Sequence, residues 1–121
     1  MRPEERDTAY LWDMQAAAQD AVRILGDLNM DEFLDSEHET TRLAVERKLE
    51  ILGEAARRTS GKLRDAHPEV PWKDVIGLRN VISHQYDKVN YEEIFGIVRD
   101  RLPELLGVLA PLIPTPPETD A

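Results

Sequence analysis

Apolar residues recur along this chain at alternating steps of three and four. Such steps place side chains on one face of an α-helix, which has about 3.6 residues per turn. No segment alternates apolar and polar residues with the period of two that a strand requires. The sequence therefore predicts an all-α protein, an antiparallel bundle of four to five helices. The stripes are Tyr10, Met14, Ala17, Ala21, Ile24 and Leu28; then Val45, Leu49, Leu52 and Ala56; then Ile94, Val98, Leu102, Leu105 and Leu109.

Capping residues set the expected starts of the early helices. Asn29 with Glu32 three residues later can open a short second helix. Ser36 with Glu39 has the same form, so it predicts the start of the long central helix. That helix should stop at residues 60–61, a serine followed by a glycine.

Two prolines punctuate the second half of the chain. Pro103 has no N–H to donate to the carbonyl of Arg99, so we expect a kink inside the last helix, which Asn90 and Glu93 cap. Pro71 is placed to begin a fourth helix. The apolar residues of that helix are Val75, Ile76, Leu78, Val81 and Ile82.

The length of 121 residues fits one domain. We expect that domain over residues 1–113 and a disordered Pro-rich tail over 114–121. The chain has no cysteine, and its three histidines, His38, His67 and His84, are too scattered to suggest a metal site. No apolar run approaches the roughly 20 residues of a membrane span, and the first ten residues lack an apolar signal core. A soluble cytoplasmic protein without metal or cofactor is expected.

The charge of the chain is unevenly distributed. Its net value of −9 disfavours simple coating of nucleic acid, because phosphate binding needs clustered cations. Residues 1–39 hold three cations against eleven acids, a net of −8, whereas residues 40–64 hold seven cations against three acids, a net of +4. The positive block is either a solvated helix face or a local surface that steers phosphate.

One dense polar cluster interrupts an apolar helix. A helix turns by about 100° per residue, so Arg79 and His84 point about 140° apart, while Tyr86 returns to the side of Arg79. Arg79 and His84 can reach one phosphate if the helix ends near His84, or if two chains share a cleft. The cluster is Arg79-Asn80-Val81-Ile82-Ser83-His84-Gln85-Tyr86.

These residue types suit cleavage of RNA without a metal ion. Histidine can take a proton from a ribose 2′-hydroxyl or give one to a leaving oxygen. Arginine offers a planar fork for a phosphate and for charge that develops in the transition state. A structural interpretation is also open: His84 can interact with the helix dipole, Arg79 can pair with an acid and Tyr86 can pack at the helix end. The cluster could equally hold a nucleotide without cutting it.

At Arg79, His84 and Tyr86 the chain resembles the Arg-x4-His-x-Tyr motif of the HepT toxins, a branch of the HEPN domains. The resemblance covers nearly everything from Asp7 to about Leu112. Flanking blocks fall in the family's usual order, namely Tyr10-Leu11-Trp12-Asp13-Met14, Asp31-Glu32-Phe33-Leu34, Leu49-Glu50-Ile51-Leu52-Gly53-Glu54-Ala55, His67-Pro68-Glu69-Val70-Pro71-Trp72 and Leu102-Pro103-Glu104-Leu105.

The resemblance implies a helical bundle that forms a homodimer and brings two motifs into one composite cleft. We expect the interface at the motif helix and around Trp72. The resemblance further implies toxicity by RNA cleavage, with Arg79 and His84 as the catalytic pair and Asn80 in support. The implied antitoxin resembles a minimal nucleotidyltransferase of the MntA type, which transfers AMP from ATP to Tyr86.

Two functions from different classes therefore remain open. The first is a ribonuclease toxin. The second is a non-catalytic subunit that binds a nucleotide, or presents a modifiable tyrosine, within a nucleotidyltransferase complex. The acidic net charge slightly favours the second function, and the intact Arg/His/Tyr set favours the first.

Overall fold

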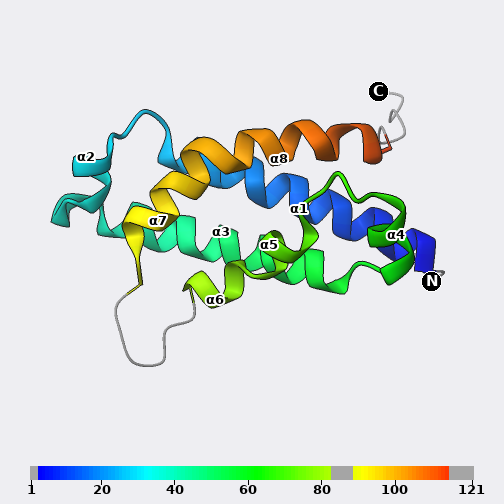
Figure 1. Cartoon of the computed structure of the whole chain (residues 1–121). Coiled ribbons are helices and arrows are strands. Elements are labelled where there is room, and N and C mark those ends of the chain that lie inside the picture. Colours follow the sequence, from blue (N-terminus) through cyan, green and yellow to red (C-terminus); the bar gives the residue numbers. More distant parts are fainter. Residues whose placement is uncertain (1–2, 83–88, 115–121) are drawn as a thin grey trace, which may run out of the picture.

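The long helices form a bundle in which successive members run in opposite directions (Figure 1). The computed structural model of the chain describes residues 3–82 and 89–114. Within these ranges all regular structure is helical, so the predicted class, an all-α antiparallel bundle of four to five helices, is confirmed. The bundle consists of α1 (Pro3–Leu25), α3 (Glu39–Arg58), the pair α5 (Trp72–Ile76) and α6 (Leu78–Ile82), and the segment from α7 (Tyr91–Gly96) to α8 (Leu102–Leu109).

Short helical segments lie at the two ends of the bundle (Figure 1). At one end, α2 (Met30–Leu34) and a 3₁₀ turn, η1 (Ser36–His38), connect α1 to α3. At the other end α4 (Gly61–Ala66) follows α3. After α8 the chain forms a second 3₁₀ turn, η3 (Ala110–Leu112).

The core lies between α1, α3, the α5–α6 pair and the α7–α8 segment. The predicted stripes of the central and last helices are fully buried. The stripe predicted for the first helix is slightly misplaced, because Tyr10, Ile24 and Leu28 are only half-buried. The buried positions of α1 are Leu11, Met14, Ala17, Ala18, Ala21 and Leu25.

The capping box predicted at Ser36 and Glu39 is wrong. Asp35 caps instead, and its carboxylate accepts the backbone N–H of Glu37 at 3.3 Å to begin η1. An Asp side chain reaches an amide two residues ahead, so it closes a tight turn before the serine can act. The Ser36 hydroxyl donates to Asp35 at 3.3 Å, and α3 starts at Glu39 without a side-chain cap. The box at residues 29 and 32 is present as predicted.

α3 ends at Arg58, close to the predicted stop at residues 60–61, and the chain then forms another helix that the sequence did not predict. The Ser60 hydroxyl accepts the N–H of Leu63 at 3.1 Å and thereby caps α4. The same hydroxyl donates to Asp7 at 2.6 Å, and the Ser60 N–H donates to Asp7 at 2.8 Å. The start of α4 is thus fixed to the start of α1.

The fourth and last helices are both interrupted. The helix predicted after Pro71 is divided at Gly77 into α5 and α6. The last helix contains a π-helical turn, η2 (Ile97–Arg101), between α7 and α8. We expected a kink at Pro103, and the structure has this wider π turn directly before the proline, which cannot donate to the carbonyl four residues before it.

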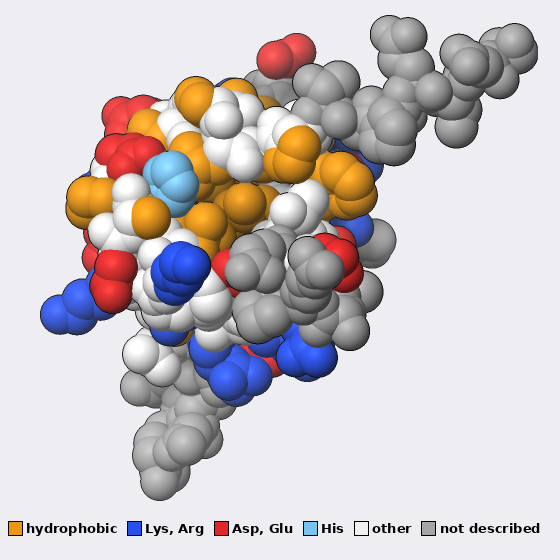
Figure 2. Space-filling view, turned by 90° about the vertical axis from the view of Figure 1, so that its right-hand side faces the viewer, with side chains coloured by type: hydrophobic (Ala, Val, Ile, Leu, Met, Phe, Trp, Pro, Cys, Tyr) orange, Lys and Arg blue, Asp and Glu red, His pale blue; other side chains and the backbone are white. Residues whose placement is uncertain are grey.

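The end of the bundle that carries α4 faces the viewer in Figure 2. Hydrophobic side chains gather at its centre, and Lys and Arg side chains gather along its lower edge. The indole of Trp12 donates to the carbonyl of Pro114 at 3.3 Å, which joins the end of the described chain to α1. The rest of the predicted tail, residues 115–121, lies outside the described residues. None of the described helices has the length and apolar content that crossing a bilayer requires.

Tyr91 fastens α7 to the neighbouring helices. Its hydroxyl donates to Glu46 of α3 at 2.6 Å, and the Arg42 guanidinium lies 5.3 Å from its ring centroid. Its ring meets Phe33 of α2 edge-on at 6.2 Å. Burial, reinforced by the hydrogen bond to Glu46, raises the pKa of Tyr91 to about 12.

We predict that Tyr91 ionises later than an ordinary tyrosine. The neutral phenol is the donor, so its contribution to stability is complete below a pH of about 10. That contribution is lost as the pH rises towards about 12. Ultraviolet titration of the phenolate should show a late step that is absent in Tyr91→Phe. The step should move to lower pH in Glu46→Gln, and an unchanged step in that variant would contradict the assignment.

Candidate active site

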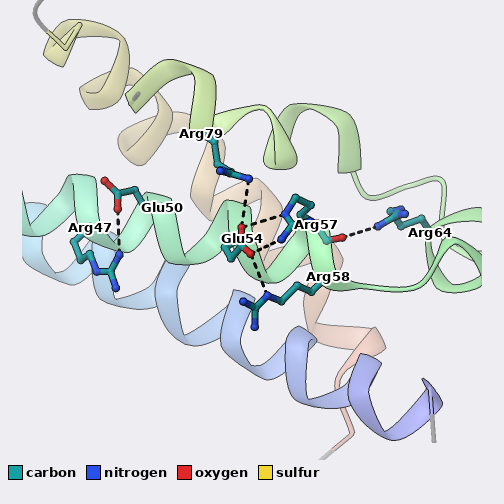
Figure 3. A network of polar contacts seen from close by, with 7 residues as sticks. All are labelled: Arg47, Glu50, Glu54, Arg57, Arg58, Arg64 and Arg79. Atoms are coloured by element: carbon teal, nitrogen blue, oxygen red, sulfur yellow. Dashed lines mark hydrogen bonds and ion pairs between the residues drawn. The ribbon is translucent and has the colours of Figure 1, made fainter. Parts of the chain in front are cut away.

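Arg79 lies on α6 and points towards α3 (Figure 3). Its Nη1 is 3.5 Å from Oε2 of Glu54, and 55% of its side chain is exposed. The arginine is therefore held by a carboxylate while most of its donors face solvent. This is the acid pairing that the structural interpretation of Arg79 anticipated, and it leaves the guanidinium accessible.

A glycine allows this contact between α3 and α6. A Cβ at Gly53 would lie 3.2 Å from the carbonyl oxygen of Val75 and 3.5 Å from Cγ of Arg79. The distance to the Val75 oxygen is shorter than in ordinary packing. Because that oxygen belongs to the backbone, it cannot move aside as a flexible side chain could. Gly53 thus lets the α5–α6 backbone approach α3 closely enough for Arg79 to reach Glu54.

Glu54 binds three arginines at once (Figure 3). Arg57 donates through Nη2 at 2.6 Å and through Nε at 3.2 Å, and Arg58 donates through Nε at 3.1 Å. Arg79 completes the set. The bond to Arg57, followed by that to Arg58, lowers the pKa of Glu54 to about 2, so its carboxylate is ionised at neutral pH.

Arg79 and Asn80 line a large cleft of about 1310 Å³. One wall comes from the loop before α5 and from α5 and α6, and the other comes from the α7–α8 segment. A smaller groove of about 430 Å³ lies between α3 and α6. Its lining is Glu46, Arg47, Glu50, Glu54, Arg79 and Ile82, so Arg79 belongs to both hollows.

The remaining predicted site residues, His84 and Tyr86, lie outside the described residues. The described part of the motif helix runs to Ile82, which is buried and anchors it to the core. The structure therefore brings Arg79 and Asn80 to one cleft. The catalytic role of His84 and the modification of Tyr86 stay predictions from the sequence.

Six of the seven cations in the positive block over residues 40–64 fall into two kinds. Arg42 donates to the carbonyls of Phe33 and Asp35, each at 2.6 Å, and Arg64 donates to the carbonyl of Thr59 at 2.7 Å. These two arginines bind backbone and hold helix ends together. Salt bridges on the surface of α3 occupy Arg47, Lys48, Arg57 and Arg58.

The sequence shows the i, i+4 spacing of Glu54 and Arg58, but the contact between Glu54 and Arg79 was not predicted. The first pair follows from helical spacing, whereas the second depends on how two helices pack. A glycine next to the acid was the available signal, because it marks a close approach of another backbone. Among the described residues, no group of three or more His, Asp or Glu side chains could hold a metal ion.

Comparison with known proteins identifies the family. The model of the family described as "Ribonuclease HepT-like" matches residues 14–112. The chain belongs to the HepT-like ribonuclease family. This membership confirms both the resemblance stated from the sequence and the predicted enzyme class, a ribonuclease.

Relatives of the chain align over more than four-fifths of their own length. "Putative RNase MJ1380" of Methanocaldococcus jannaschii is 36% identical over 97 residues, which cover 80% of this chain and 87% of that protein. "Putative RNase MJ0127" of the same organism is 35% identical over 101 residues, covering 84% and 82%. "Probable ribonuclease HepT" of Thermococcus cleftensis is 30% identical over 98 residues, covering 81% and 87%. No solved structure matches the chain.

Proposed function

We propose that this HepT-like protein is the toxin of a two-component toxin–antitoxin pair and acts in the cytoplasm by cutting RNA without a metal ion. The observation that carries the proposal is Arg79, which belongs to the family motif and lines a cleft with most of its side chain exposed. Asn80 lines the same cleft and supports the helix end or the phosphate.

The chemistry needs a proton acceptor, a proton donor and an anion clamp. His84 takes the proton of a ribose 2′-hydroxyl, and the 2′-oxygen attacks the adjacent phosphorus. The bond from phosphorus to the 5′-oxygen breaks, and a protonated histidine gives that oxygen its proton. The products are a 2′,3′-cyclic phosphate and a 5′-hydroxyl. Arg79 stabilises the negative charge that develops on the phosphoryl oxygens.

A homodimer would solve the geometric problem that the motif poses. Two copies related by a twofold axis present the same surface to each other. The large cleft suits such a contact because its two sides differ in charge. On the wall from the loop before α5, α5 and α6, two cations balance two acids, and Arg57 of α3 adds one positive charge, whereas the other wall carries a negative excess. On the α7–α8 wall, Glu93, Asp100 and Glu104 outnumber Arg101. Trp72 is buried in the chain's own core, so the expected interface would use the residues that flank it.

Neutralisation would follow from AMP transfer to Tyr86 by an antitoxin of the MntA type. The Tyr86 hydroxyl oxygen attacks the α-phosphorus of ATP, pyrophosphate leaves, and the phenolic proton passes to a base. The new phosphodiester carries a negative charge that can pair with Arg79 in place of RNA. The added nucleoside also blocks the approach to His84.

We predict that His84→Ala lowers RNA cleavage by about 10²–10⁴-fold, the usual value of general acid–base catalysis. Cleavage should be measured in a chelator on single-stranded RNA, with the cyclic phosphate identified at the product ends. His67→Ala is the matched control, since that histidine lies in a loop and binds Glu69 at 3.1 Å. Full activity of His84→Ala, or inactivity of the unaltered protein with RNA bound, would favour the non-catalytic nucleotide-binding function.

We also predict that light scattering at micromolar concentration gives the mass of a dimer. A stable interface buries roughly 800 Å² per partner. The large cleft would form part of this interface, and Val108 lies half-buried in it. Val108→Asp should shift the mass to a monomer while circular dichroism still reports a helical fold. Leu43→Asp, at an apolar residue of α3 that is 54% exposed, should leave the mass unchanged. A monomer for the unaltered chain would exclude the composite cleft.

A further prediction is that co-expression with the nucleotidyltransferase of the pair leads to AMP transfer to the chain. Mass spectrometry should find one or more AMP-sized additions, and Tyr86→Phe should remove them. Tyr91→Phe is the control, because the Tyr91 hydroxyl is already bound to Glu46. Complete neutralisation of a chain that carries no AMP would show that the antitoxin acts by binding alone.

A further inference from the structure

The cluster around Glu54 holds more positive than negative charge. Three guanidinium groups face a single carboxylate, so the four side chains carry a net charge of +2. The pair of Arg47 with Glu50, farther back on α3, is balanced one to one. An additional anion would therefore be attracted to this part of an otherwise acidic protein.

The geometry places the donors outside and the carboxylate beneath them. The side chains of Arg57, Arg58 and Arg79 are 51%, 56% and 55% exposed, whereas that of Glu54 is 33% exposed. Each guanidinium has five N–H groups, and the contacts with Glu54 occupy one or two of them. The remaining donors are available for phosphate oxygens, which arginine binds through a planar fork.

These arginines differ from those that hold the fold together. Arg42 and Arg64 donate to backbone carbonyls at helix ends. In the described part of the chain, the side chains of Arg57 and Arg58 bind Glu54 alone. Exposed ion pairs of this kind contribute little to stability, so a phosphate can replace one without unfolding the helix.

The cluster also lies beside the proposed active site. Arg79 is shared with the catalytic motif, Arg57 lines the large cleft, and Glu54 lines the groove between α3 and α6. If Arg79 holds the scissile phosphate of an RNA strand, the neighbouring phosphates of that strand would lie along α3, next to Arg57 and Arg58. Figure 3 shows the three arginines converging from two helices onto the same carboxylate.

We propose that Arg57 and Arg58 bind the RNA backbone phosphates next to the scissile phosphate. Glu54 is the built-in counterion that holds the three guanidinium groups in place until RNA displaces it. This inference rests on the proposed function, because the phosphates bound by Arg57 and Arg58 belong to the same RNA strand that the ribonuclease site would cut. It assigns Glu54 as a positioning residue and the two arginines as a binding site.

The test measures binding of a single-stranded 2′-O-methyl RNA, which lacks the attacking hydroxyl and stays intact. Affinity is followed by fluorescence anisotropy across a range of salt concentrations. Arg57→Ala and Arg58→Ala should each weaken binding and reduce the slope of log affinity against log salt by about 0.7, the value for one phosphate contact on a single strand. Arg23→Ala is the matched control, because it removes the same charge and an i, i+3 pair on α1.

Glu54→Gln tests the counterion separately. This variant keeps the side-chain shape but removes the charge that competes with phosphate, so binding should tighten about twofold to fivefold, the effect of one exposed ion pair. Unchanged or weaker binding would overturn the role of Glu54. Slopes for Arg57→Ala and Arg58→Ala equal to that of Arg23→Ala would overturn the phosphate site.

Cleavage of unmodified RNA by the unaltered protein separates this inference from the proposed function. If the protein fails to cut RNA while Arg57 and Arg58 still set the salt slope, the binding site stands and the ribonuclease proposal fails. If RNA is cut while neither arginine affects the slope, the ribonuclease proposal stands and the binding site fails.

Discussion

The rest of the structure depends on the burial of α3 between its neighbours. α3 packs extensively against α1, its residues Val45, Leu49 and Leu52 are fully buried, and the α5–α6 backbone approaches it at Gly53. Burying a large apolar side chain contributes about 1.5–3 kcal/mol, whereas an exposed ion pair contributes about 0–1 kcal/mol. The apolar contacts therefore fix the helices, and the exposed ion pairs on the outer face of α3 contribute little to holding them together.

The sequence predicted most of the fold because the apolar stripes are local and periodic. The stripes of the central and last helices are buried at every predicted position. The errors arise where two local signals compete or where contacts are distant. Asp35 caps the turn at which the sequence predicted a cap from Ser36. Ser60, which was expected only to end the central helix, caps a further helix. Neither outcome follows from residue spacing alone.

The candidate site was predictable in its residue types but not in its surroundings. Arg79 stood out because a charged residue interrupts an apolar helix. Its partner Glu54 belongs to another helix, and their contact exists because Gly53 removes a Cβ from the space between them. The cations of the positive block also have different surroundings, which the sequence did not reveal. Some of its cations brace helix ends, while Arg57 and Arg58 face solvent around a shared acid.

The π-helical turn at Ile97–Arg101 bears on how well the last helix would tolerate the deletion of one residue. In a regular helix, deleting one residue rotates everything after it by about 100° and turns the apolar stripe away from the core. A π turn amounts to one residue added to an α-helix. Losing a residue here would restore the α-helical register and leave Ile94 and Leu105 facing the core, while Pro103 would still lack an N–H to donate. A variant of this chain that lacks one residue at this turn can therefore keep the same packed interior.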